Sequence, residues 1–191
     1  MRSKASRCLT RRAVLQRVCA WSLCAAGEVL GRAADAAELR VGESAPEATL
    51  VTLDGRRLST TALNGQVVIL TFWATWCVPC RDELPLLSKY ATDHAGQGLT
   101  VLGFSLDTAD QLAGVRKVAQ ALSFPVGLLE RSSAPGYGRI WRLPVSFTID
   151  RAGRLAENGW KEKEPTWTAE RLEQVVTPLL TGAARAATSG P

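Results

Sequence analysis

The chain has 191 residues, of which 46% are hydrophobic and 21% are charged, with five cysteines. This length favours one domain, and the apolar share is enough for a packed core. The formal net charge of +5 comes from residues 1–37, which hold seven basic and two acidic residues, whereas residues 38–191 hold sixteen of each. The balance argues against a nucleic-acid-binding protein, because phosphate binding needs a sustained basic patch.

Residues 1–37 have the organisation of an export signal. Basic residues precede a short apolar run over 18–27, and Ala34-Asp35-Ala36 offers a small-residue cleavage site. The segment from Thr10 to Gln16 is similar to a twin-arginine signal, and a general secretory signal is the alternative. The apolar run is short for a bilayer core of ~30 Å. We therefore expect a cleaved signal, with an uncleaved membrane anchor as the alternative.

Cleavage would leave two of the five cysteines. Cys8, Cys19 and Cys24 lie in the leader, and Cys77 and Cys80 remain. An exported protein with one close pair of cysteines fits a redox catalyst better than a scaffold stapled by disulfides.

The expected domain covers residues 38–182, and it begins with a hairpin. Alternation over residues 48–53 predicts a strand, Asp54-Gly55 a turn, and residues 56–58 a return strand. Ser59 or Thr60 is placed to cap a one-turn helix through Leu63.

A pair of cysteines follows the most apolar run of the chain. Residues 67–73 predict a buried strand, and the spacing of Leu84, Leu87 and Ala91 predicts a helix that ends near His94. The motif Cys77-Val78-Pro79-Cys80 therefore lies at the junction between a predicted strand and a predicted helix. At the helix N-terminus, free N–H groups favour the Cys77 thiolate, which is the form that attacks disulfides.

Two other readings of the pair are weaker. A structural disulfide is disfavoured because so short a loop removes little entropy from the unfolded chain. A zinc site needs further ligands, and beyond residue 36 the sequence offers one histidine, His94, besides this pair.

The second half of the chain predicts alternating strands and helices. Residues 99–106 predict a central strand, Asp107 or Thr108 a helix start with an end near residue 122, and residues 124–129 a short strand. After Pro144, we expect a strand over 145–149, a hairpin turn over 150–154 and an edge strand over 155–160. We expect Thr166 or Thr168 to start a final helix with four apolar residues facing inward (Leu172, Val175, Val176, Leu179), and residues 183–191 to form a flexible tail.

Three segments together resemble the TlpA/ResA-like family of exported thioredoxin-fold thiol–disulfide oxidoreductases. They are Asn64-Gly65-Gln66-Val67-Val68, the run from Phe72 to Cys80 followed by Glu83-Leu84-Pro85, and the run from Leu143 to Asp150 with Gly153. The resemblance spans residues 40–180. It implies an α/β thioredoxin-like fold with a central mixed sheet flanked by helices, an N-terminal β-hairpin extension and a central helix–strand insertion.

The resemblance also implies roles for residues of the site. Cys77 and Cys80 form the redox-active disulfide, Trp76, Pro79, Glu83 and Pro144 support it, and Val78 and Leu143 contact the substrate. The Leu143–Pro144 bond is expected to be cis, so that the Leu143 backbone can pair with an extended substrate. Thr71 stands where thioredoxin has a buried aspartate. Glu83 can take over that proton-handling role, or it can be a solvated acid of the first helical turn.

The motif and the export signal predict a periplasmic thiol–disulfide oxidoreductase. The family resemblance further implies that it reduces protein disulfides in cytochrome c or copper-centre assembly and that a membrane thiol-electron donor reduces it again. We expect no metal or organic cofactor, and a monomer. A disulfide donor or isomerase is the alternative, followed by a copper or zinc carrier that uses Cys77, Cys80 and His94, and by a peroxiredoxin-type peroxidase.

Overall fold

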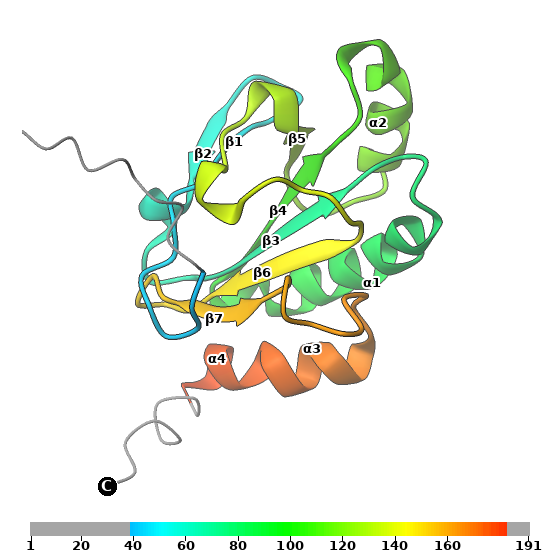
Figure 1. Ribbon diagram of the computed structural model, residues 1–191. Coiled ribbons are helices and arrows are strands. Elements are labelled where there is room, and N and C mark those ends of the chain that lie inside the picture. Colours follow the sequence, from blue (N-terminus) through cyan, green and yellow to red (C-terminus); the bar gives the residue numbers. More distant parts are fainter. Residues whose placement is uncertain (1–38, 183–191) are drawn as a thin grey trace, which may run out of the picture. The chain divides into compact units, whose positions relative to one another are not determined.

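A mixed five-stranded sheet forms the centre of the computed structural model, which describes residues 39–182 (Figure 1). The predicted export signal and the predicted C-terminal tail lie outside the described residues. The strands follow the order β5-β4-β3-β6-β7. Their bounds are Val67–Trp73 for β3, Leu99–Ser105 for β4, Val126–Leu128 for β5, Val145–Ile149 for β6 and Leu155–Asn158 for β7. β3 pairs in parallel with β4 and antiparallel with β6, which confirms the predicted mixed sheet.

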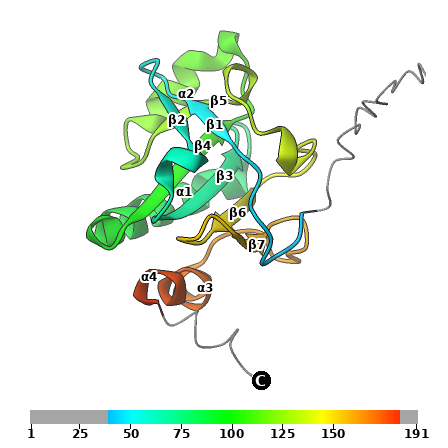
Figure 2. The same cartoon turned by 90° about the vertical axis from the view of Figure 1, so that its left-hand side faces the viewer.

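The predicted hairpin forms a separate two-stranded sheet beside β5 (Figures 1 and 2). It consists of β1 (Thr49–Val51) and β2 (Arg57–Ser59), and the N–H of Leu53 donates to the carbonyl of Val126 at 2.9 Å. The Ser59 side chain caps a short 3₁₀ helix over Thr60–Leu63, as one of the two predicted capping residues.

Within residues 39–182, four α-helices accompany the sheet: α1 (Val78–His94), α2 (Leu112–Ala119), α3 (Ala169–Val175) and α4 (Thr177–Thr181). α2 and β5 form the expected central insertion, but α2 is shorter than predicted because it is preceded by a 3₁₀ turn that Thr108 caps. The prediction of a single final helix is wrong. Thr168 starts it, but it divides into α3 and α4, because Pro178 has no N–H for the helical hydrogen bond. None of the helices in residues 39–182 is long and apolar enough to cross a membrane.

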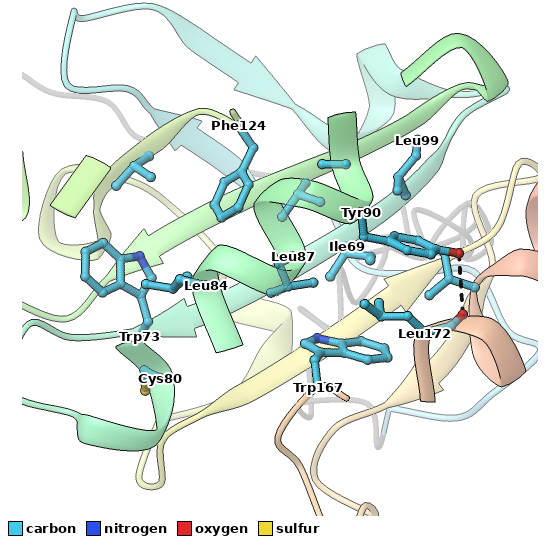
Figure 3. Close-up of a cluster of buried hydrophobic side chains, with 14 of the residues drawn as sticks. Ile69, Trp73, Cys80, Leu84, Leu87, Tyr90, Leu99, Phe124, Trp167 and Leu172 are labelled. Carbon is cyan, nitrogen blue, oxygen red and sulfur yellow. Dashed lines mark hydrogen bonds between the residues drawn. The ribbon is translucent and has the colours of Figure 1, made fainter. Parts of the chain in front are cut away.

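Both faces of β3 are buried, which explains its continuous apolar sequence. Alternate side chains point to opposite faces. On one face, Ile69 and Trp73 join a core with Leu84 and Leu87 of α1 and Leu172 of α3 (Figure 3). The core of the other face contains residues of β3, β6 and the N-terminal hairpin (Leu50, Val68, Leu70, Phe72, Phe147). The strand that leads to the cysteines is therefore fixed from two sides.

Candidate active site

The two cysteines lie at the junction of β3 and α1. Cys77 is the N-cap residue of α1, and it forms a disulfide with Cys80 in which the sulfurs are 2.02 Å apart and the Cα atoms 5.3 Å apart. The N–H of Cys80 donates to the Cys77 sulfur at 3.3 Å. Pro79 occupies the first helical turn, where an N–H has no helical partner. After reduction, the free N–H groups of this turn stabilise a Cys77 thiolate.

The two sulfurs differ in their access to solvent. Cys77 is 6% exposed, whereas Cys80 is fully buried in the core between the sheet and α1. Thiol–disulfide exchange requires the attacking sulfur to reach the substrate sulfur directly. Cys77 is therefore the sulfur that an external disulfide can reach, whereas Cys80 is accessible only to Cys77.

A groove of about 430 Å³ runs along the exposed side of Cys77. Residues 76–79 form one wall, residues 140–143 form the other, and Leu106 lies at the end of β4. The lining is apolar except for the cysteine and Arg142. The Leu143–Pro144 peptide bond is cis, and Pro144 itself is buried just behind this wall.

Glu83 points into the protein, one turn along α1 from Cys80. Its side chain is 1% exposed, and its Oε2 accepts the Trp167 N–H at 2.8 Å, whereas Oε1 has no partner among the described residues. Burial raises the pKa of Glu83 to about 7, and the Trp167 N–H and the Arg171 charge oppose this shift. The reading of Glu83 as a solvated first-turn acid is therefore wrong.

A buried ion pair lies close to Glu83. The Arg171 guanidinium stacks over the Trp167 ring at 4.3 Å and pairs with Glu157, whose other oxygen accepts the Thr148 hydroxyl at 2.9 Å. Burial raises the pKa of Glu157 as well, while Arg171 opposes the shift. The Arg171 charge thus lowers the pKa of both buried carboxyl groups and so opposes the effect of their burial.

Thr71 supplies a hydroxyl but no acid to this region. It lies on the same face of β3 as Ile69 and Trp73, and it pairs with Ser146 across β3 and β6. Both hydroxyl oxygens are buried without a partner among residues 39–182. Glu83 is consequently the buried carboxyl group within one helical turn of Cys80.

Asp107 is a contact of the site that sequence reasoning missed, because the pattern suggested only a helix cap. It is buried, and it accepts the Thr75 N–H at 2.8 Å, the Thr75 hydroxyl at 2.5 Å and the Ser105 hydroxyl at 2.6 Å. Asp107 therefore ties the end of β4 to the loop that carries Trp76 and Cys77.

We expect Asp107→Asn to loosen this loop. An amide has one acceptor oxygen in place of two, so at least one buried donor loses its partner, which costs roughly 1–3 kcal/mol of unfolding free energy. Hydrogen exchange at the Trp76 and Cys77 amides should become faster. Asp110→Asn is the matched control, because Asp110 is exposed three residues further along. Unchanged hydrogen exchange at these amides in Asp107→Asn would contradict this role of Asp107 in holding the loop.

The alternative of a metal carrier is excluded because His94 lies too far from the two cysteines to share a metal ion with them. His94 is the last residue of α1 and lies fourteen positions after Cys80, a rise of roughly 20 Å along the helix. The His94 ring packs instead against the Tyr90 ring, with centroids 4.0 Å apart and an angle of 31° between the planes. Within residues 39–182, no group of three or more His, Cys, Asp or Glu side chains is arranged to hold a metal ion.

The structure gathers most of the predicted site residues around one groove. Trp76, Cys77, Val78, Pro79 and Leu143 line it. Cys80, Glu83 and Pro144 are buried and do not line it. The two aromatic residues Tyr137 and Trp141, which precede Pro144 in the chain, have different environments. Tyr137 is buried and donates to the Pro46 carbonyl, whereas Trp141 is exposed in the groove wall.

Comparisons with known proteins agree with this site. The model of the AhpC/TSA family matches residues 41–158. The thiol-disulfide oxidoreductase ResA of Bacillus cereus is 31% identical over 149 residues, which cover 76% of this chain and 83% of that protein.

Two solved structures have a similar fold. A putative thiol:disulfide interchange protein DsbE from Chlorobium tepidum has a TM-score of 0.61 at 27% identity, and the match covers 74% of this chain and 99% of that one. A putative protein disulfide isomerase from Bacteroides thetaiotaomicron has a TM-score of 0.62 at 25% identity, with coverage of 78% and 96%. With its disulfide at the helix start and these relatives, the chain belongs to the AhpC/TSA family and is a thiol–disulfide oxidoreductase of the ResA/TlpA-like type.

Proposed function

We propose that the protein is exported to the periplasm and reduces disulfides in other exported proteins. The observation that carries this proposal is the asymmetry of the pair: Cys77 reaches an apolar groove, and Cys80 is buried behind it. Such a site admits one substrate sulfur to Cys77 and keeps the second thiol away from solvent oxidants. The export signal predicted in residues 1–37 supports the location.

The exchange takes place in two steps. The Cys77 thiolate attacks one sulfur of the substrate disulfide, so that a Cys77–substrate disulfide forms and the other substrate sulfur leaves as a thiolate. The Cys80 thiolate then attacks Cys77, and the first substrate sulfur leaves. The substrate gains two electrons, and Cys77 and Cys80 end as the disulfide seen in the structure. A membrane thiol-electron donor returns two electrons to the pair.

Glu83 is placed to exchange the proton of Cys80. Residues three apart on a helix have Cβ atoms about 5–6 Å apart. A carboxyl group with a pKa of about 7 is half protonated at neutral pH, so it can both accept the Cys80 proton and return it. We therefore propose Glu83 as the proton-handling residue that Thr71 cannot provide.

The direction of electron flow follows from what stabilises each redox state. Cys80 is buried beside a carboxyl group, which destabilises its thiolate and so favours the disulfide. A favoured disulfide makes the dithiol a reductant. One observation supports the alternative of a disulfide donor: the helix N-terminus stabilises the Cys77 thiolate and acts in the opposite sense.

We propose as substrates the cysteines of cytochrome c haem attachment or of copper-centre assembly, as the family resemblance implies, and a monomeric working state. The test uses the pre-reduced protein and a peptide with an internal Cys-x-x-Cys-His disulfide, the haem-attachment motif. We expect one peptide disulfide to be reduced per protein molecule, with no turnover of hydrogen peroxide. If the oxidised protein instead oxidises the dithiol peptide to completion, the donor alternative is correct. Rapid peroxide turnover would indicate the peroxidase.

A further inference from the structure

Trp141 is the most exposed large apolar side chain of the groove. Its exposed fraction is 70%, and it stands in the segment directly before the Leu143–Pro144 bond. Because it lines the same groove as Cys77, a substrate bonded to Cys77 has to pass it.

The Trp141 ring is held in place although most of its surface is exposed. It stacks on Trp160 with ring centroids 5.5 Å apart and an angle of 11° between the planes. Trp160 is anchored by a hydrogen bond from its Nε1 to the Tyr137 carbonyl at 2.8 Å. A rigid aromatic surface binds a partner with little loss of side-chain entropy.

Arg142 lies against both rings of this stack and gives the groove its charge. Its guanidinium carbon lies 5.5 Å from the Trp141 ring centroid and 5.9 Å from that of Trp160, and it donates to the carbonyls of Gly159 and Glu162. Among residues 39–182 no carboxylate pairs with it within 4.0 Å. The groove therefore presents apolar surface and one cation, which disfavours a cationic occupant.

We propose that Trp141 is the subsite for an aromatic or large aliphatic side chain next to the reactive cysteine of an extended polypeptide substrate. The proposal rests on the proposed function and adds a substrate preference to it. The substrate sulfur sits about 2 Å from the Cys77 sulfur in the mixed disulfide, and an extended chain advances about 3.3 Å per residue. Residues one or two positions from the substrate cysteine therefore lie in the groove.

The experiment compares disulfide peptides that differ at one position. Four Cys-x-x-Cys-His peptides carry Trp, Leu, Ser or Lys directly before the first cysteine, and the second-order rate constant is measured with pre-reduced protein. We expect the Trp peptide to react about tenfold faster than the Ser peptide, which corresponds to an aromatic contact of about 1.4 kcal/mol. The Lys peptide should react slowest, because the groove already holds the Arg142 cation. In Trp141→Ala the Trp-to-Ser ratio should fall to within about twofold.

Val41→Ala is the matched control, because Val41 is also an exposed apolar side chain but does not line the groove. Its Trp-to-Ser ratio should equal that of the wild type. Equal rates for the Trp and Ser peptides in the wild type, with an unchanged ratio in Trp141→Ala, would overturn the proposal while leaving disulfide reduction intact.

Calorimetry with redox-inert peptides, in which both cysteines are serine, separates the proposal from the proposed function. Tighter binding of the inert Trp peptide, lost in Trp141→Ala, supports the subsite even if no peptide is reduced. Equal binding of both inert peptides overturns it. A dimer in sedimentation that Trp141→Ala dissociates would also overturn it, since a second copy would then occupy the groove.

Discussion

Replacing Cys80 by serine is expected to trap the protein on its substrate. With Cys77 still present, the first exchange step proceeds, but no second thiol is available to release the mixed disulfide. Cys77→Ser should form no such adduct, because the remaining Cys80 sulfur is fully buried. Catalytic turnover should fall by on the order of a thousandfold or more in both variants. Mass spectrometry of the adduct after incubation with the disulfide peptide provides the measurement.

The packing of Cys80 requires a second variant. Serine in the core places a hydroxyl among apolar side chains such as Trp73 and Leu84, which costs roughly 1–3 kcal/mol if it finds no partner. Cys80→Ala avoids this cost and should trap the same adduct. An adduct on Cys80 in Cys77→Ser would show that the assignment of the two sulfurs is reversed.

Glu83→Gln is expected to change how stability depends on pH. In the folded protein burial raises the pKa of Glu83 from 4.5 to about 7. Between these two values the folded chain holds a proton that the unfolded chain has released, so the free energy of unfolding of the wild type falls as the pH rises and levels off above pH 7. The gap corresponds to a loss of about 3 kcal/mol across this window. The Gln variant should not lose this free energy. Its free energy of unfolding relative to that of the wild type should therefore rise by a similar amount as the pH increases across this window.

The comparison isolates Glu83 from its neighbours. Burial also raises the pKa of Glu157, and Arg171 faces both acids, but these groups are present in both proteins. Urea unfolding of the oxidised proteins at pH 4.5 and at pH 8 gives the two free energies. Asp82→Asn is the matched control, because Asp82 precedes Glu83 on α1 and is exposed. Parallel pH curves for wild type and Glu83→Gln would show that Glu83 is charged throughout.

Local patterns were sufficient to predict the framework of the site. The apolar run of β3, the Cys-x-x-Cys motif and the spacing of α1 are contiguous in sequence, so the junction at Cys77 could be predicted residue by residue. The hairpin of β1 and β2 follows from alternation and the Asp54-Gly55 turn. The cis bond before Pro144 came from the family resemblance, since base rates alone argue against it.

Features that depend on distant segments could not be predicted. The burial of Glu83 requires Trp167, which is 84 residues away, to cover it. The hydrogen bonds of Asp107 to Thr75 join residues 32 positions apart. The groove wall that contains Trp141 comes close to Cys77 only when β6 pairs with β3. The break between α3 and α4 is a local feature instead, because it follows from Pro178, which interrupts the helical pattern of the sequence.

The reduction potential of the Cys77–Cys80 pair tests the central claim most directly. The protein is equilibrated with mixtures of reduced and oxidised dithiothreitol or glutathione, and the free thiols are counted by alkylation and mass spectrometry. A reductant should have a potential well below about −200 mV, towards the thioredoxin value of about −270 mV. A potential near about −120 mV, the value of a strong disulfide donor, would contradict the assignment as a reductase.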